Sequence, residues 1–136
     1  MRVVAFDLET YLLAPGQAAP RVVCMSYCDE DGDSGLHLRD DALPVAHALL
    51  DNEDIILVGH NLPFDMACLC RADGSLLPKV FAAYDAGRVR CTLVRDKLLL
   101  LSPGQLADAY DTGSKRGVRF TLEAVVRRRF GIDLKE

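Results

Sequence analysis

Residues Val3-Val4-Ala5-Phe6-Asp7-Leu8-Glu9-Thr10 lead from a stretch of apolar side chains directly into two carboxylates. The apolar stretch predicts a buried strand, Arg2–Glu9. Because alternate side chains of a strand lie on the same face, Asp7 and Glu9 share a face, with their bases roughly 6–7 Å apart. Two carboxylates that close raise each other's pKa unless a cation lies between them. This segment therefore predicts a strand that ends in a site for divalent metal.

The composition is that of a single globular domain. The chain has 136 residues, of which half are hydrophobic and about a quarter charged, enough to bury a core without staples. It contains neither a long uncharged apolar run nor a basic segment followed by an apolar one at its start, so we expect a cytoplasmic protein without membrane association. The five cysteines are expected to be reduced, since their spacing does not fit a zinc site.

Charge is distributed unevenly along the chain. Residues 1–85 carry 5 basic and 14 acidic side chains, whereas residues 86–136 carry 11 basic and 6 acidic ones. An acidic half that can hold cations and a basic half that can hold phosphates would suit a polyanionic substrate. Solvated faces that happen to segregate in this way would give the same pattern.

Apolar patterns and turn residues predict alternating strands and helices after an initial meander. Strands are expected at Arg2–Glu9, Arg21–Cys28, Gly35–Arg39, Asp54–Gly59 and Arg88–Cys91. Helices are expected at Asp41–Leu50, Asn61–Arg71, Leu76–Ala86, Thr92–Leu101 and Phe120–Phe130, with a basic loop at Tyr110–Arg119. This order predicts an α/β fold, a ribonuclease H-like mixed sheet of about five strands with helices on both faces.

The acidic turn Asp29–Asp33 resembles a calcium loop in its alternate aspartates. Ser34 stands where such a loop needs its glycine, and strands flank the turn, so a solvated hairpin turn is expected instead.

A third carboxylate, Asp65, falls in the first turn of the helix that follows the Asp54–Gly59 strand. If that strand lies beside the first one, Asp7, Glu9 and Asp65 converge at the carboxyl ends of the strands, where ligand sites of α/β sheets gather. Three carboxylates suit Mg²⁺ or Mn²⁺, and two such ions can clamp a phosphoryl transfer. Asp65 could instead complement the helix dipole. His60 is expected to be a core or loop histidine, and Asn61 a helix N-cap.

Two motifs carry a family resemblance. Phe6-Asp7-Leu8-Glu9-Thr10 resembles the first motif of the DEDD superfamily of 3′–5′ exonucleases, and Gly59-His60-Asn61-Leu62-Pro63-Phe64-Asp65 resembles the second, Asn-x-x-Phe-Asp. Thr92–Leu101 and Phe120–Lys135 extend the similarity, the latter to the helix and loop before the third motif in proofreading domains of family A DNA polymerases.

The resemblance implies that residues 1–136 form a single 3′–5′ exonuclease-like domain. Asp7 would bridge two Mg²⁺ or Mn²⁺ ions, Glu9 would bind the ion on the nucleophile side, and Asp65 would hold the other ion directly or through water. The pocket for the 3′-terminal nucleotide would be lined by Leu8, Thr10, Asn61 and Phe64. The reaction would release nucleoside 5′-monophosphates from the 3′ end of single-stranded DNA, as in proofreading.

The family's third motif adds a fourth carboxylate and, four residues earlier, a Tyr or His that orients the attacking water. It should follow Phe120–Glu136, and the pairs Tyr84-Asp85 and Tyr110-Asp111 lack that spacing. The domain is therefore expected to be incomplete at its C-terminal end, a fragment of a phage or bacterial DNA polymerase. Without the water-orienting residue its rate could fall about 10²–10⁴-fold. A polymerase domain or a second copy of the chain would cover the place of the absent helix.

Two other functions fit the same residues. The chain could be a catalytically inactive module that binds nucleic acid or a protein partner and retains the exonuclease fold, or a ribonuclease H-like nuclease that cuts internally. The basic loop Lys115-Arg116-Arg119 could contact phosphates or be a solvated loop. The choice between DNA and RNA depends on contacts with the 2′-hydroxyl, which the sequence does not reveal.

Overall fold

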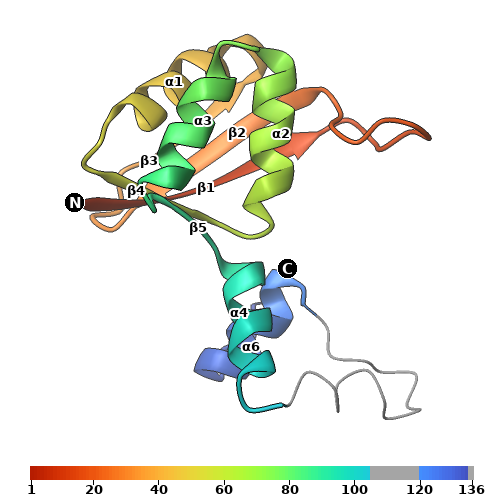
Figure 1. Ribbon diagram of the computed structural model, residues 1–136, viewed down its shortest axis with the longest axis vertical. Helices are drawn as coiled ribbons and strands as arrows, with labels where there is room; N and C mark the ends of the chain where they lie inside the picture. The colour runs from red at the N-terminus through yellow and green to blue at the C-terminus, as the bar shows by residue number, and fades with distance from the viewer. Residues whose placement is uncertain (105–119, 135–136) are drawn as a thin grey trace. The chain divides into compact units, whose positions relative to one another are not determined.

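The computed structural model describes residues 1–104 and 120–134. The chain divides into two compact units, Met1–Cys91 and Thr92–Glu136. The first unit holds a sheet with three α-helices, and the described part of the second holds two further helices (Figure 1). The predicted loop at 110–119, with its basic side chains, lies outside the described residues.

Five strands form one mixed sheet, which confirms the predicted fold class. They are β1 (Arg2–Thr10), β2 (Val22–Asp29), β3 (Ser34–Leu38), β4 (Ile55–Gly59) and β5 (Val89–Cys91). Their order in the sheet is β3-β2-β1-β4-β5, so the first strand is central. The β1–β2 and β2–β3 pairs are antiparallel, whereas β1–β4 and β4–β5 are parallel.

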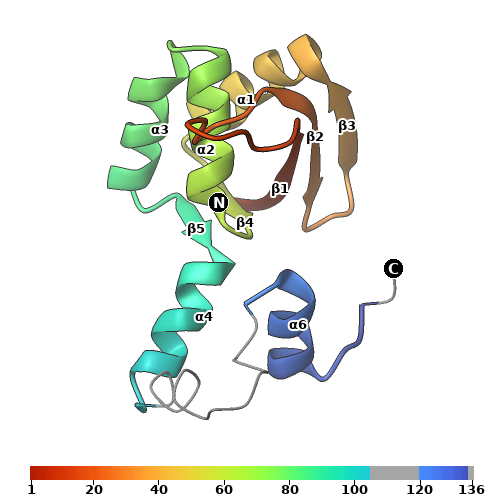
Figure 2. The ribbon, with the colours of Figure 1, turned by 90° about the vertical axis from the view of Figure 1, so that its right-hand side faces the viewer.

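Helices connect the strands where the sequence predicted them. They are the short 3-10 helix η1 (Arg39–Asp41), α1 (Ala42–Asp51), α2 (Leu62–Ala72), α3 (Leu76–Asp85), α4 (Thr92–Leu101) and α6 (Leu122–Phe130). Within the first unit, α1, α2 and α3 lie on the same face of the sheet, as the two views show (Figure 2), so the predicted helices on both faces are not found in this unit. The reason is that the Phe6 side of β1 is apolar from Val4 to Leu8, whereas Asp7 and Glu9 are exposed on the other side. Among the described residues, no helix has the length and apolar character needed to span a bilayer.

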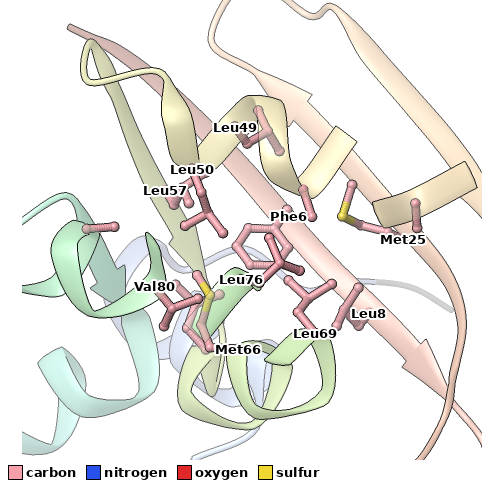
Figure 3. Packing of buried hydrophobic residues seen from close by; sticks show 14 of the residues in the cluster. Phe6, Leu8, Met25, Leu49, Leu50, Leu57, Met66, Leu69, Leu76 and Val80 are labelled. Atoms are coloured by element: carbon pink, nitrogen blue, oxygen red, sulfur yellow. The ribbon is translucent and has the colours of Figure 1, made fainter. Parts of the chain in front are cut away.

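The hydrophobic core lies between these three helices and the sheet. Along β1 the residues Val4, Phe6 and Leu8 are at most 6% exposed, while Asp7 and Glu9 on the other face stay exposed. Phe6 lies in the middle of the cluster, surrounded by apolar side chains of α1, α2 and β4 (Figure 3). The alternation of buried and exposed residues fixes which face of β1 the carboxylates occupy.

The acidic turn between β2 and β3 is a hairpin turn, as predicted, but its first aspartate is not solvated. Asp29 is 8% exposed, and one of its carboxylate oxygens accepts hydrogen bonds from the N–H groups of Asp31 and Asp33 at 3.0 and 2.8 Å. The other oxygen pairs with Arg2 at 3.3 Å. Asp29 therefore holds the turn together, because a buried carboxylate needs such partners.

In the second unit, a buried carboxylate links the two helices. Asp96 of α4 is 2% exposed and pairs with Arg128 and with Arg129, whose Nε lies 2.8 Å from the carboxylate, on α6. Helix α6 ends at Phe130 because Gly131 adopts a left-handed conformation with φ of 69°. The end of this helix is thus where the sequence predicted it.

Candidate active site

The shortness of β4 creates an opening beside β1. Ala5 pairs with Val58, and β4 ends one residue later at Gly59, so the part of β1 that carries Asp7 and Glu9 has a strand neighbour only on its β2 side. The chain then turns into α2, whose amino end lies beside this opening. The predicted neighbourhood of the two strands is confirmed, and it directs the first turn of α2 toward the carboxylates.

The turn between β4 and α2 is tightly constrained. A Cβ atom on Gly59 would lie 2.8 Å from the carbonyl oxygen of Phe6 and 2.5 Å from the side chain of Leu62, so only glycine fits here without displacement. Asn61 occupies the N-cap position, but its φ of 70° is left-handed and its side chain makes no capping hydrogen bond. The predicted N-cap position of Asn61 is confirmed, but its side chain does not supply the capping hydrogen bond. The turn requires a left-handed residue, which asparagine tolerates better than most.

Asp65 lies on the first turn of α2 and is 3% exposed. Burial, followed by repulsion from Asp7, raises the pKa of the Asp65 carboxyl to about 7, although hydrogen bonds from the backbone N–H groups of Leu8 and Asp65 itself favour its charged form. A buried carboxylate next to a second one is costly unless a proton or a cation neutralises it. Asp65 is therefore poised to exchange a proton for a cation near neutral pH.

Asp7 connects the other two carboxylates electrostatically. Partial burial, then repulsion from Glu9, raises the pKa of the Asp7 carboxyl, while the nearby His60 lowers it. The prediction from the strand period, that Asp7 and Glu9 share one face, is confirmed by their alternation with buried Phe6 and Leu8. The structure thus brings Asp7 into electrostatic reach of both Glu9 and Asp65.

The four residues predicted to line a nucleotide pocket are placed differently from one another. Leu8 is 6% exposed, and its side chain belongs to the hydrophobic core on the helix side of β1. It therefore does not share the face of the carboxylates, because neighbours along a strand point to opposite faces. Thr10 and Phe64 are half-buried, with Phe64 packed against the core, and Asn61 is exposed.

The sequence did not assign His60 to the site, although its charge acts on Asp7. Its position directly after β4, at the sheet edge where Asp65 was expected, was the signal. Tyr84 on α3 is a second addition, since Asp65 and Cys91 both act electrostatically on its hydroxyl. Helices α2 and α3 are antiparallel neighbours, which brings the carboxyl end of α3 near the amino end of α2 (Figures 1 and 2).

Large apolar side chains also follow β1 directly. Tyr11, Leu12 and Leu13 are 48%, 92% and 65% exposed, immediately beyond Glu9 and Thr10. Three consecutive exposed apolar residues at the edge of a candidate site favour contact with a ligand. Their position in the segment between the predicted strands Arg2–Glu9 and Arg21–Cys28 was the available signal.

The donor chemistry at this edge fits a hard divalent cation. Carboxylate oxygens are the ligands preferred by Mg²⁺ and Mn²⁺. Burial and, after it, repulsion from a neighbouring carboxylate raise the pKa values of Asp7 and Asp65, and a cation would relieve that repulsion. Over residues 1–104 and 120–134, no three His, Cys, Asp or Glu side chains already form a closed ligand cluster. Binding would thus require the carboxylates to adjust around the ion.

Comparison with known proteins identifies the family of this chain. Residues 1–99 match the family model of the 3′-5′ exonucleases. No curated protein matches the sequence significantly. Solved structures show the same fold. Brucella melitensis NrnC with bound Mg²⁺ has a TM-score of 0.64 and 22% identity over 98% of this chain and 55% of that one.

Two further structures agree. Brucella melitensis NrnC bound to pGG has a TM-score of 0.62 at 20% identity, over 98% of this chain and 55% of that chain. The EXO domain of Aedes aegypti Nibbler has a TM-score of 0.60 at 15% identity, over 98% and 61%. The chain thus spans little more than half the length of these proteins. With the motifs on β1 and α2 and a family match over most of its length, the chain belongs to the 3′-5′ exonuclease family.

Proposed function

We propose that this chain is a metal-dependent 3′–5′ exonuclease domain that removes nucleoside 5′-monophosphates from the 3′ end of a single strand. The observation that carries the proposal is the electrostatic coupling of Asp7 with Glu9 and with Asp65 at the open edge of β1. Such a cluster is unfavourable for the protein alone and becomes favourable when it holds cations.

In this proposal Asp7, Glu9 and Asp65 would hold two Mg²⁺ or Mn²⁺ ions. When bound, the ions would activate water and stabilise charge on the attacked phosphate. The exposed side chains of Leu12 and Leu13 would contact the terminal base, and half-buried Phe64 would support it from α2. Water adds to the terminal phosphorus, the bond to the 3′ oxygen of the preceding nucleotide breaks, and that oxygen takes up a proton.

His60 would position Asp7 rather than contact substrate, because its effect in the structure is on the Asp7 carboxyl. Proofreading of DNA is the narrower form of the proposal, since the sequence resembles polymerase proofreading domains. Action on RNA is the alternative form. A proofreading domain should shorten a DNA strand at least as fast as the matched RNA strand.

The test uses a single strand labelled at its 5′ end, prepared as DNA and as RNA, and incubated with the chain and Mn²⁺. We expect a ladder that shortens stepwise from the 3′ end, lost in Asp7→Ala and kept in Cys28→Ala. Cys28 is a suitable control because it lies on an exposed position of the neighbouring strand, opposite Ala5. Internal fragments would contradict the exonuclease assignment. Binding without cleavage would support the inactive module instead.

A further inference from the structure

A cavity of about 270 Å³ lies between the start of β2 and the last turns of α2. A single water needs only about 10–15 Å³ of such space, so the cavity can hold a larger group. Its lining consists of Pro20, Arg21, Cys68, Arg71 and Ala72. Two of these five residues are arginines, and none is a carboxylate.

Neither of the two arginines at the cavity has a carboxylate partner in the described chain. Within residues 1–104 and 120–134, ion pairs engage Arg2, Lys79, Arg127, Arg128 and Arg129, and none engages Arg21 or Arg71. Arg71 donates one hydrogen bond to the carbonyl oxygen of Ala19. A guanidinium group has five N–H donors, so this bond leaves donors for a ligand. Two cations without carboxylate partners beside one cavity favour an anion there.

The cavity is connected to the carboxylate site through two elements. On α2, Cys68 lies about one turn beyond Asp65, and Arg71 about one turn beyond Cys68, so each residue neighbours the next along the helix. Cys68 accordingly responds electrostatically to both Asp65 and Arg71. At 1.5 Å per residue, Arg71 is roughly 9 Å along the helix from Asp65.

Strand pairing places the other side of the cavity, at Arg21, near the end of β1. Val22 pairs with Thr10, and the carbonyl oxygen of Arg21 accepts a hydrogen bond from the N–H of Tyr11 at 2.9 Å. Arg21 therefore lies just beyond Glu9, at the carboxyl end of β1. Of the residues that line the cavity, Arg21 thus lies next to the carboxyl end of β1, and Arg71 lies about two turns of α2 beyond Asp65.

A purely structural role explains only part of this arrangement. Arg71 lies in the last turn of α2, where a cation interacts favourably with the helix dipole, and it ties Ala19 to the helix. Neither function needs Arg21, whose side chain is exposed at the cavity without an ion pair in the described residues. A shared anion accounts for both arginines.

We propose that the cavity between Arg21 and Arg71 binds a backbone phosphate of the substrate strand, upstream of the phosphate that is cleaved. The inference rests on the proposed exonuclease function, and it assigns phosphate recognition to residues of the first unit alone. Arginine is well suited to this role, since its fork of donors matches phosphate oxygens. The contact positions the strand without reading its sequence.

The test measures binding of a fluorescein-labelled single strand in the presence of a chelator, so that no cleavage intervenes. Arg21→Gln and Arg71→Gln, alone and together, are compared with Arg2→Gln, which removes the same charge at the opposite end of β1. We expect the double variant to lose at least about tenfold in affinity, because both groups that donate to the phosphate are removed. The slope of log affinity against log salt should fall by about 0.7, the value for one phosphate of a single strand. Arg2→Gln should bind as the wild type does.

A second series identifies the phosphate. Each phosphate of the strand is replaced in turn by an uncharged methylphosphonate, and one position near the 3′ end should weaken binding to wild type but not to the double variant. Equal affinity of all variants, or a methylphosphonate effect that persists in the double variant, would overturn the proposal. The proposal would also be overturned if inorganic phosphate bound to the cavity but no single methylphosphonate weakened binding of the strand.

Thermal unfolding separates binding from folding. If Arg71→Gln lowers the melting temperature, the affinity of Arg21→Gln alone tests the proposal. None of the described contacts of the Arg21 side chain supports the fold. The outcome is also independent of the activity. Arginine-dependent binding without cleavage in Mn²⁺ would refute the exonuclease proposal and leave the cavity assignment standing. If the double variant cleaved and bound the strand as the wild type does, the exonuclease proposal would stand and the cavity assignment would be refuted.

Discussion

The two faces of β1 carry side chains of different character and have different roles. Val4, Phe6 and Leu8 are buried beneath the helices, whereas Asp7 and Glu9 point to the open face. The first set gains free energy from leaving water, and the second carries charge that the protein alone does not neutralise. Stability and the proposed chemistry are thus assigned to alternate residues of one strand, and single substitutions should separate them.

The largest effect is expected at Asp7. Asp7→Asn keeps the shape of the side chain but removes the shared charge between the two proposed ions. We expect hydrolysis of a single strand in Mn²⁺ to slow about 10³-fold or more, since a metal supplies several kcal/mol to such a reaction. The melting temperature should stay the same or rise. Single-turnover rates beside thermal unfolding measure both, and Ser26→Ala on β2, directly opposite, is the control.

Phe6→Ala tests the other face. Because Phe6 is 5% exposed and central to the core, its truncation should cost about 3–5 kcal/mol of folding free energy. Urea unfolding measures the loss. Ala5→Ser, one residue away on the exposed face, should change stability by less than about 0.5 kcal/mol. Comparable losses from both variants would refute the division between the faces.

Asp65→Asn tests stability and metal binding together, because Asp65 is buried like the core residues and is also one of the three carboxylates of the candidate site. The folded-state pKa of about 7 lies above the unfolded value of 3.8. The stability that the neutral carboxyl contributes is therefore fully present below about pH 4 and is lost as the pH rises through 7.

With a chelator present, Asp65→Asn should be more stable than wild type at pH 8, by on the order of a few kcal/mol, with the difference vanishing near pH 4. Mn²⁺ should narrow or reverse the difference at pH 8, since only the carboxylate binds it well. Denaturation at several pH values gives the comparison. A variant that is less stable at every pH would show that Asp65 is a structural carboxylate instead.

Gly59→Ala should destabilise the fold less than Phe6→Ala does. The added Cβ would lie too close to the backbone of Phe6 and to Leu62, a strain of about 1–3 kcal/mol. The same shift would move the first turn of α2, so activity should fall together with stability. Gly74→Ala, where nothing lies within 4 Å of the added atom, is the matched control.

Sequence reasoning predicted the order and class of the elements because strong apolar patterns and turn residues delimit them. The shared face of Asp7 and Glu9 follows from the two-residue period of a strand. The same period places Leu8 on the other face, and the motif resemblance alone had put it in the pocket. The two-residue period of the strand should have been used to predict that Leu8 lies on the face opposite Asp7 and Glu9.

Other features depend on the folded chain and had no local signal. The left-handed turn at Asn61 arises because β4 ends close against β1, a contact between residues far apart in the sequence. Arg21 and Arg71 meet at one cavity although 50 positions separate them. The proximity of His60 to Asp7 likewise follows from the pairing of β1 with β4.

The central claim is that the open edge of β1 and the first turn of α2 form a divalent cation site. Calorimetric titration of Mn²⁺ at pH 7, in two buffers of different ionisation enthalpy, tests it most directly. We predict binding to wild type with release of protons, chiefly from Asp65, and loss of that binding in Asp7→Asn. Undiminished binding to Asp7→Asn, or no binding to wild type, would contradict the claim.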